Sequence, residues 1–205
     1  MATRIYESAR ERLLDAAQRL ILERGLSGLS VEAVISEVGL SKGGFFHHFK
    51  TKNDLILALL DRLVRRMDGF VAELAAKDPQ PRGARLRAQI ALSFDSKRQE
   101  AEAPQALLLA FVEAVKSQPT VRRLARELNA QAVARDVGEG IPEGRAMLIQ
   151  FALDGFWLSE AVGTAALTAK QRRALRDELI ALALVEAGPA TLTRTATKTR
   201  KGKRS

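Results

Sequence analysis

Apolar residues recur every three or four positions along most of the chain, the spacing that places them on one face of an α-helix. In the first part of the chain this pattern predicts helices over about 8–24, 31–38, 42–49 and 52–77. Ser30, Ser41 and Thr51 stand directly before three of these runs, where a hydroxyl caps free backbone N–H groups. Gly25 and Gly39 follow the first two runs, where glycine commonly ends a helix.

The segment KDPQPRG at 77–83 interrupts the helical pattern and predicts a loop. Beyond it, helices are expected at about 84–100, 104–117, 120–137, 142–165 and 169–187. No strand is evident, so the predicted fold class is all-α. The predicted organisation is a three-helix unit at 1–52, a long fourth helix leading into a helical domain at 53–188, and a tail at 189–205.

The net charge of +9 is concentrated in the tail. Residues 189–205 contain six Lys or Arg and no Asp or Glu, whereas 53–188 contain nineteen basic and eighteen acidic residues. The tail is low in complexity and is predicted to be disordered, adding at most nonspecific affinity for DNA. The overall charge is therefore weak evidence that the folded part binds nucleic acid.

Composition excludes several classes of function. The chain has no Cys, which rules out disulfides, Cys-ligated zinc, iron–sulfur clusters and thiol catalysis, and which fits the cytoplasm. Its longest apolar runs are seven residues, 106–112 and 179–185, so neither a membrane span nor a secretory signal is expected. The only two histidines are adjacent, and no glycine-rich phosphate loop follows a strand. An enzyme is not expected, nor is a cofactor.

The two short helices at 31–38 and 42–49, joined by a Gly-Leu-Ser turn, have the size and spacing of a helix-turn-helix. At 100° per residue, Phe45 faces the core and the opposite side of the second helix carries Gly43, Gly44 and His47. Two glycines in a first turn lower helix stability, and their use is the close approach of the backbone to a partner. This face is therefore small, polar and shaped to enter a groove.

Lys42 and Lys52 each occupy the first position of a predicted helix, where a cation opposes the helix dipole. A lysine at the start of a helix is favourable if an anion such as a DNA phosphate binds there. The alternative is that both lysines are simply solvated. His47 and His48 can equally be ordinary surface residues. A metal site is not expected there, because adjacent helical residues point about 100° apart and no acid lies at ligand spacing.

The stretch RERLLDAAQRLILERGLSGLSVEAVISEVGLSKGGFFHHFKTKNDLILALL resembles the DNA-binding domain of TetR/AcrR-type transcriptional regulators. The resemblance rests on the DAAxxLxxxxG helix, the GLSKG turn, the HF pair and the KxxL start of the fourth helix. It implies a dimeric regulator with its third helix in the major groove of a double-stranded operator. The groove-facing residues are then Lys42, Gly43, Gly44 and His47, and those at or near phosphates are Ser30, Ser41, Phe46, His48 and Lys52.

Phe46 departs from the pattern of this family, which usually has Tyr at the corresponding position. The resemblance implies that the Tyr hydroxyl commonly meets a phosphate. Phe46 lacks that hydroxyl and offers packing alone. Specific readout is therefore expected to depend on few side chains.

The predicted helix at 142–165 is apolar nearly all round, whereas a helix packed only on its own core shows one apolar stripe. We expect one face to pack inside the chain and another to pack against a second copy, as in a four-helix bundle. A monomer in which this helix is central is the alternative. The expected dimer interface comprises Phe151, Gly155, Trp157, Leu158 and Val162, with Leu175, Leu179 and Leu182 of the last helix.

A ligand cavity is expected around the apolar segment QALLLAFVEAV at 105–115, which contains one acid. Its predicted lining comprises Phe94, Leu108, Phe111, Glu113 and Asp154. Glu113 could hold a cationic ligand among these apolar side chains, or it could pair with one of the many arginines.

The function predicted from these features is a DNA-binding regulator, most simply a repressor released from a palindromic operator by a small molecule. Two alternatives remain open. One is an architectural DNA binder without sequence preference, and the other is a helical carrier of small apolar molecules with a vestigial helix-turn-helix.

Overall fold

The computed structural model describes residues 8–95 and 105–184, and within these ranges the chain is helical throughout, with no strand. This confirms the all-α prediction. The elements are α1 (Ala9–Arg24), η1 (Leu26–Gly28), α2 (Val31–Val38), α3 (Lys42–His48), α4 (Lys52–Ala75), α5 (Ala84–Ser93), α7 (Gln105–Ser117), α8 (Pro119–Gly138), α9 (Glu143–Ala161) and α10 (Ala169–Leu184). The basic tail and the first seven residues lie outside the described ranges.

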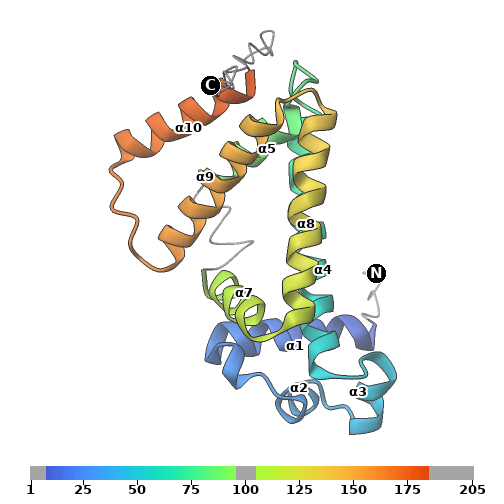
Figure 1. The fold of residues 1–205 in the computed structure, drawn as a ribbon. Coiled ribbons are helices and arrows are strands. Elements are labelled where there is room, and N and C mark those ends of the chain that lie inside the picture. The colour runs from blue at the N-terminus through green and yellow to red at the C-terminus, as the bar shows by residue number, and fades with distance from the viewer. Residues whose placement is uncertain (1–7, 96–104, 185–205) are drawn as a thin grey trace, which may run out of the picture.

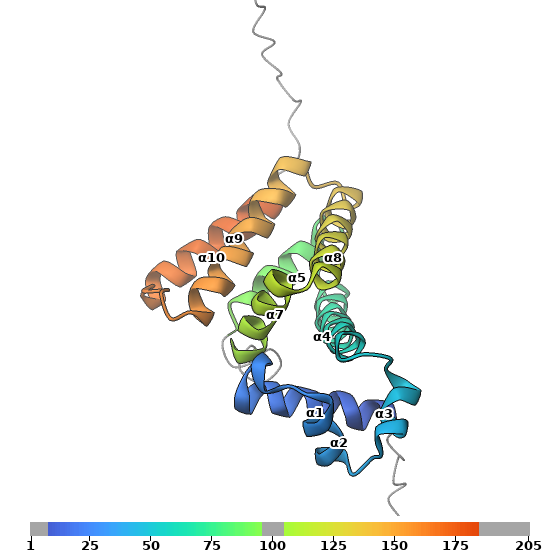
Figure 2. The same cartoon turned by 60° about the horizontal axis from the view of Figure 1, so that its bottom comes forward.

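Hydroxyl caps set the start of the first four α-helices. The side chains of Ser8, Ser30 and Ser41 each accept a backbone N–H from three residues ahead. Thr51 does the same for α4, and Asp54 accepts the N–H of Thr51 in return, which completes a capping box. Helices α1, α2 and α3 lie together at one end of the molecule (Figures 1 and 2).

The core of this end extends beyond the three-helix unit. Phe45 of α3 and Leu55 of α4 are completely buried in it, together with Ala114 of α7, which is 1% exposed. Helix α7 packs against both α1 and η1. The division at residue 52 stays a prediction, but apolar packing is continuous across it.

Arg62 ties α4 to α1 through polar contacts. One guanidinium nitrogen lies 2.7 Å from a carboxylate oxygen of Asp15 and 3.3 Å from one of Glu11, and the other donates to Gln18 at 2.9 Å. Planar guanidinium donors hold such a fork in a fixed geometry. The start of α4, which carries Lys52, is thereby held in place relative to α1.

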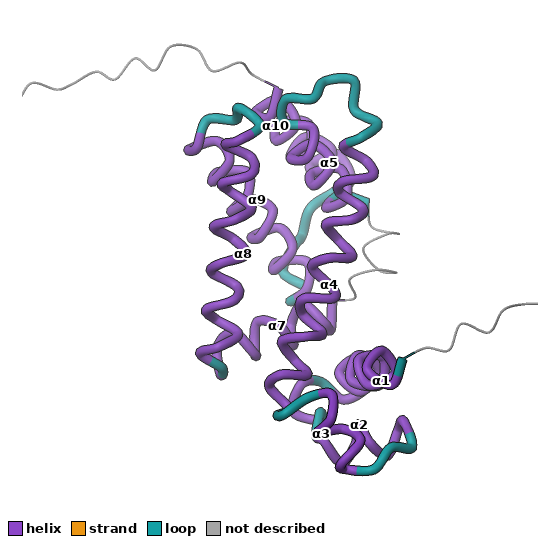
Figure 3. The backbone as a smooth tube through the Cα atoms, turned by 90° about the vertical axis from the view of Figure 1, so that its right-hand side faces the viewer, coloured by secondary structure: helices purple, strands orange, loops and turns teal. Residues whose placement is uncertain are grey.

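A second core joins α5, α9 and α10. Its buried members include Leu86 and Ile90 of α5, Ile149 of α9 and Leu179 of α10. Helices α4 and α8 run lengthwise, and α9 and α10 lie toward the end remote from α2 and α3 (Figures 1 and 3). No helix in the described part of the chain has the length and apolar content that crossing a membrane requires.

At two helix ends the structure departs from the sequence prediction by more than three residues. The helix expected over 84–100 ends at Ser93, and residues 96–100 lie outside the described ranges. The helix expected over 142–165 ends at Ala161, because Gly163 takes a φ of 73° and the N–H of Thr164 turns back to the carbonyl of Ser159 at 2.9 Å. A left-handed glycine with this returning hydrogen bond is a common helix stop.

Gly83 and Gly163 provide a test of the packing around the α4–α5 loop, since both have positive φ (68° and 73°). A Cβ atom on Gly83 would lie 2.9 Å from the carbonyl oxygen of Ala183 and from Cδ1 of Ile141, whereas one on Gly163 meets nothing within 4 Å. Gly83→Ala is expected to lower the free energy of unfolding by about 2–4 kcal/mol, and Gly163→Ala by about 1 kcal/mol. Urea unfolding measures both, and equal losses would contradict the close packing at Gly83.

Candidate DNA interface and ligand cavity

The turn between α2 and α3 is held by a left-handed glycine and an arginine. Gly39 has a φ of 72° and ends α2. Arg12 of α1 reaches across and donates to the carbonyl of Val38 at 2.6 Å. Ser41 then caps α3 by accepting the N–H of Gly44 at 3.1 Å. The turn is therefore fixed from both sides, and α3 leaves it at a defined angle.

Helix α3 presents one face to the core and another to solvent. Phe45 is fully buried, whereas Gly43 and His47 are exposed. A Cβ atom on Gly43 would meet only the Ser41 hydroxyl, at 3.8 Å, so this part of the helix is open to a partner. Phe46 is 44% exposed and stands edge-on to Phe45. The sequence predicted these faces for Phe45, Gly43 and His47. Gly44, which was expected on the same side as Gly43, is half-buried, and a Cβ atom on it would lie 3.7 Å from Cβ of Leu40.

The two lysines at the helix starts have different surroundings. Lys42 Nζ lies 3.6 Å from a carboxylate oxygen of Glu32, and both side chains are exposed. Such a surface pair contributes little stability, so Lys42 can exchange it for a phosphate. Lys52 is half-buried and donates to the carbonyl of Leu29 at 3.3 Å. This contact directs the Lys52 ammonium toward the η1–α2 connection, beside the Ser30 cap.

The hydroxyl groups and histidines complete this surface. Ser30 and Ser41 use an oxygen lone pair to cap helices, so each hydroxyl proton is still available to a phosphate oxygen. The rings of His47 and His48 stand edge-on with centroids 5.0 Å apart. Among the described residues no group of His, Cys, Asp and Glu is placed to hold a metal ion.

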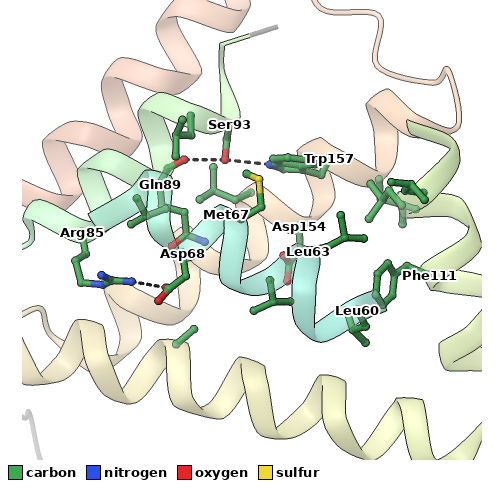
Figure 4. A pocket seen from close by; sticks show the side chains of 18 of the residues that line it. Leu60, Leu63, Met67, Asp68, Arg85, Gln89, Ser93, Phe111, Asp154 and Trp157 are labelled. Atoms are coloured by element: carbon green, nitrogen blue, oxygen red, sulfur yellow. Dashed lines mark hydrogen bonds and ion pairs between the residues drawn. The ribbon is translucent and has the colours of Figure 1, made fainter. Parts of the chain in front are cut away.

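A cavity of about 530 Å³ lies between α4, α5, α7, α8 and α9. Its walls are mostly apolar and include Leu60, Leu63, Met67, Leu107, Phe111 and Trp157 (Figure 4). A volume of this size suits a drug-sized molecule. The Trp157 indole N–H donates to the Ser93 hydroxyl at 3.0 Å, and that hydroxyl donates to the carbonyl of Gln89. The indole is therefore anchored in the wall.

Five charged residues also line the cavity. Asp68 of α4 pairs with Arg85 of α5 and lies 3.6 Å from a guanidinium nitrogen of Arg135 of α8. Asp136 of α8 is only 4% exposed, and burial together with the neighbouring Glu139 raises the pKa of its carboxyl to about 6.

Asp154 of α9 is the remaining charged residue of the cavity wall. It stays accessible to solvent, but its apolar surroundings raise the pKa of its carboxyl by desolvation. A hydrogen bond from the Gln150 amide, at 3.2 Å, partly opposes that rise.

Comparison with known proteins identifies the family. Residues 13–59 match the model of bacterial regulatory proteins of the tetR family, and residues 83–184 match the tetracyclin repressor-like C-terminal domain. The transcriptional regulator BetI of Brucella anthropi is 31% identical over 186 residues, covering 86% of this chain and 93% of that protein. The chain belongs to the TetR family. It is a DNA-binding transcriptional regulator with an N-terminal helix-turn-helix.

Solved structures of a transcriptional regulator and of a multidrug binding protein share the fold. A transcriptional regulator from Rhodococcus sp. Rha1 superposes with a TM-score of 0.69 at 24% identity, covering 86% of this chain and 96% of that one. The multidrug binding protein EbrR complexed with ethidium superposes with a TM-score of 0.61 at 25% identity, covering 86% and 99%.

The structure corrects two of the residues expected in the TetR ligand cavity. Leu108, Phe111 and Asp154 do line it. Glu113 is exposed and outside the lining, because it lies on the solvent side of α7. Phe94 is also outside the lining, since its ring stacks on Phe156 with centroids 4.5 Å apart.

The residues expected at the dimer interface separate into two groups. Gly155 is exposed, as are Phe151 (66%), Leu158 (44%) and Val162 (50%), although Leu158 also lines the cavity. The side chains of the other group turn inward in the single chain, and their place in an interface stays a prediction. Trp157 lines the cavity, Leu179 is buried in the second core, and Leu175 and Leu182 are half-buried against it, because α10 packs on α5 and α9.

The buried acid Asp136 was not identified from the sequence, although a signal was present. Leu128, Ala132 and Asp136 are spaced by four residues, so Asp136 continues an apolar face of α8. The contacts of Asp68 with Arg85 and Arg135 join three helices and have no local signature.

Asp136→Asn should stabilise the protein in a pH-dependent way. The pKa of Asp136 in the folded chain, about 6, lies above the ordinary value of 3.8 for this carboxyl, so ionisation lowers native stability as pH rises through this interval. The substitution should raise the free energy of unfolding by on the order of 2–3 kcal/mol at pH 7.5 and by about half as much at pH 5. Urea unfolding at both pH values measures this, with Asp61→Asn as control. A gain independent of pH would contradict the assignment.

Proposed function

We propose that this TetR-family protein acts as a homodimeric repressor that leaves a palindromic operator when a small molecule fills the cavity. The observation that carries the proposal is the outer face of α3. This helix begins with Lys42, is open to a partner at Gly43 and is exposed at His47. A helix with this face fits the major groove. His47 is proposed to contact base edges, and Lys42 and Lys52 phosphates.

The apolar stripe of α9 supports the dimer. Its exposed members are spaced at helical intervals on one side of the helix: Met147, Leu148, Phe151, Leu158 and Val162. Gly155 interrupts the stripe with a small, exposed position at which a second helix can approach closely. Symmetric pairing of α9, flanked by α10, would form a four-helix bundle. Two copies of α3 about 34–36 Å apart would then read two half-sites.

Selection of genomic fragments by the purified protein, followed by footprinting, tests this function. A protected palindrome with half-sites about 10 base pairs apart, centre to centre, is expected. If competitor DNA of random sequence removes the protein from the selected fragments, an architectural role is indicated. Absence of any DNA binding would point to a carrier of small molecules.

Phe46→Tyr tests the placement of α3 on the backbone. Phe46 is 44% exposed beside the groove-facing residues, so a hydroxyl on its ring would be free to reach a phosphate. The variant is expected to bind DNA about fivefold more tightly per protomer, on any sequence, because a phosphate contact carries no base information. Electrophoretic mobility shifts on operator and random DNA measure this. An unchanged affinity on both, or a changed consensus site, would contradict the placement.

A further inference from the structure

The charges around the cavity are unequally paired. Both guanidinium groups of the wall, on Arg85 and Arg135, have Asp68 as a partner. The other two carboxylates of the wall, Asp136 and Asp154, have no ion pair among the described residues. Three carboxylates therefore share two cations, and the deficit is one positive charge.

Asp136 is the more deeply buried of these two carboxylates. It is 4% exposed, and its Oδ2 has no hydrogen-bond partner in the described part of the protein. A buried carboxylate oxygen without a partner is costly, and native structures rarely retain one without a reason. Because Asp136 lines the cavity, a ligand can supply what the protein does not.

Asp154 lies in the α9 wall of the cavity, which the anchored ring of Trp157 also lines. Among the described residues its hydrogen bond comes from the Gln150 amide, and the Gln150 oxygen accepts from Gln89 in turn. Trp157 follows it by three residues on α9 and lines the same cavity (Figure 4). The indole N–H is already used by Ser93, so the ring offers a ligand its π-system and apolar surface rather than a donor.

We propose that the ligand of this cavity is an amphipathic organic cation, whose charge lies against Asp154 and whose apolar body fills the space between Leu63, Phe111 and Trp157. An aromatic ring near a carboxylate attracts a quaternary or iminium cation more than a neutral body of the same shape. The buried Asp136 is a second acceptor, for a donor group on the ligand. This inference rests on the proposed function, since it names the class of molecule that the same cavity takes.

Neutral and anionic ligands fit the wall less well. A neutral ligand would displace water from the cavity and leave the Asp154 carboxylate in apolar surroundings without a counter-charge. An anion would add a like charge to the three carboxylates already present. The complex of EbrR with ethidium, an aromatic cation, is consistent with a cation in a related fold.

A matched pair of probes tests the charge directly. Trimethyl(4-hydroxyphenyl)ammonium and 4-tert-butylphenol have the same shape and differ by one nitrogen for carbon and one charge. Calorimetric titration of the full chain at pH 7.5, without DNA, should give at least about tenfold tighter binding of the cation. Asp154→Asn should remove about tenfold of that affinity and leave the neutral probe within about twofold.

Two further variants keep the test decisive. Asp61→Asn makes the same change on α4, where Asp61 pairs with Arg65 outside the cavity lining, and should leave both probes unchanged. Asp136→Asn should weaken both probes to a similar degree, because the hydroxyl group that would donate to Asp136 is common to the two. Circular dichroism confirms that each variant is folded.

Several results would overturn the inference. They are equal affinity for the two probes, equal weakening of both by Asp154→Asn, and binding of neither probe at millimolar concentration. Failure of the proposed function is distinguishable, because it is measured by operator binding. If a neutral compound releases the operator while the cation does not bind, the repressor function is supported and the cation site is contradicted. If the cation binds selectively and no operator is found, the cation site is supported and the proposed repressor function is not.

Discussion

Phe151→Glu is expected to convert the proposed dimer into monomers and to lower operator affinity at least about a hundredfold, because a single half-site remains. Phe151 is 66% exposed in the single chain, at the middle of the apolar stripe of α9. Symmetric pairing would bury two copies of the ring close together, and two glutamates there would be desolvated and of like charge. Sedimentation velocity at micromolar concentration and mobility shifts on the operator measure the two effects.

Leu109→Glu is the matched control for this variant. Like Phe151, Leu109 is an apolar residue with an exposed side chain. It is 39% exposed, but it lies on α7, outside the stripe. It should leave both association and operator binding unchanged. A Phe151→Glu protein that stays dimeric, or a monomeric wild type that binds its operator with full affinity, would show that α9 is not the interface.

Gly43→Glu is expected to abolish measurable DNA binding, a loss of at least about a hundredfold, while making the protein more stable. The new side chain would project from the open face of α3 and bring bulk and negative charge to the groove and the phosphates. The same change replaces a glycine in a helix and puts an acid in its first turn. Both effects are favourable, together by about 0.5–1 kcal/mol.

A loss of DNA affinity together with a gain in the free energy of unfolding distinguishes this result from misfolding, which would lower both. Gly69→Glu makes the same substitution at an exposed position of α4 where a Cβ atom meets nothing within 4 Å. It should stabilise the protein to a similar degree and leave DNA binding unchanged. If Gly43→Glu retained operator affinity, the outer face of α3 would not be at the DNA.

Local signals in the sequence were sufficient to predict the helices and the helix-turn-helix. Ser30, Ser41 and Thr51 cap α2, α3 and α4 as predicted, because a cap needs only a hydroxyl and the N–H groups two or three residues ahead. The face of α3 also followed from its 100° repeat, since Phe45 is a large apolar side chain opposite two exposed polar or small positions.

Local signals failed where more than one face of a helix is apolar. Helix α9 is such a case, and its 3.6-residue repeat does not say which apolar residues meet α5, which line the cavity and which remain uncovered. Trp157 and Phe151 therefore looked equivalent in sequence, and only the placement of α9 against α5 and α10 separated them.

The sequence by itself determined the all-helical class, the DNA-binding motif and the TetR resemblance, because these depend on caps, turns and short-range spacing. Asp154 was expected in the cavity from the sequence, but only the tertiary structure decided between Glu113 and Asp136. Glu113 was the acid within the apolar segment, yet it points to solvent, whereas Asp136, from a different helix, is buried in the wall. The pairing of Asp68 with Arg85 and Arg135 likewise joins three helices. Such contacts arise when helices pack, and the energy of a buried charge depends on those neighbours rather than on the residues beside it in the chain.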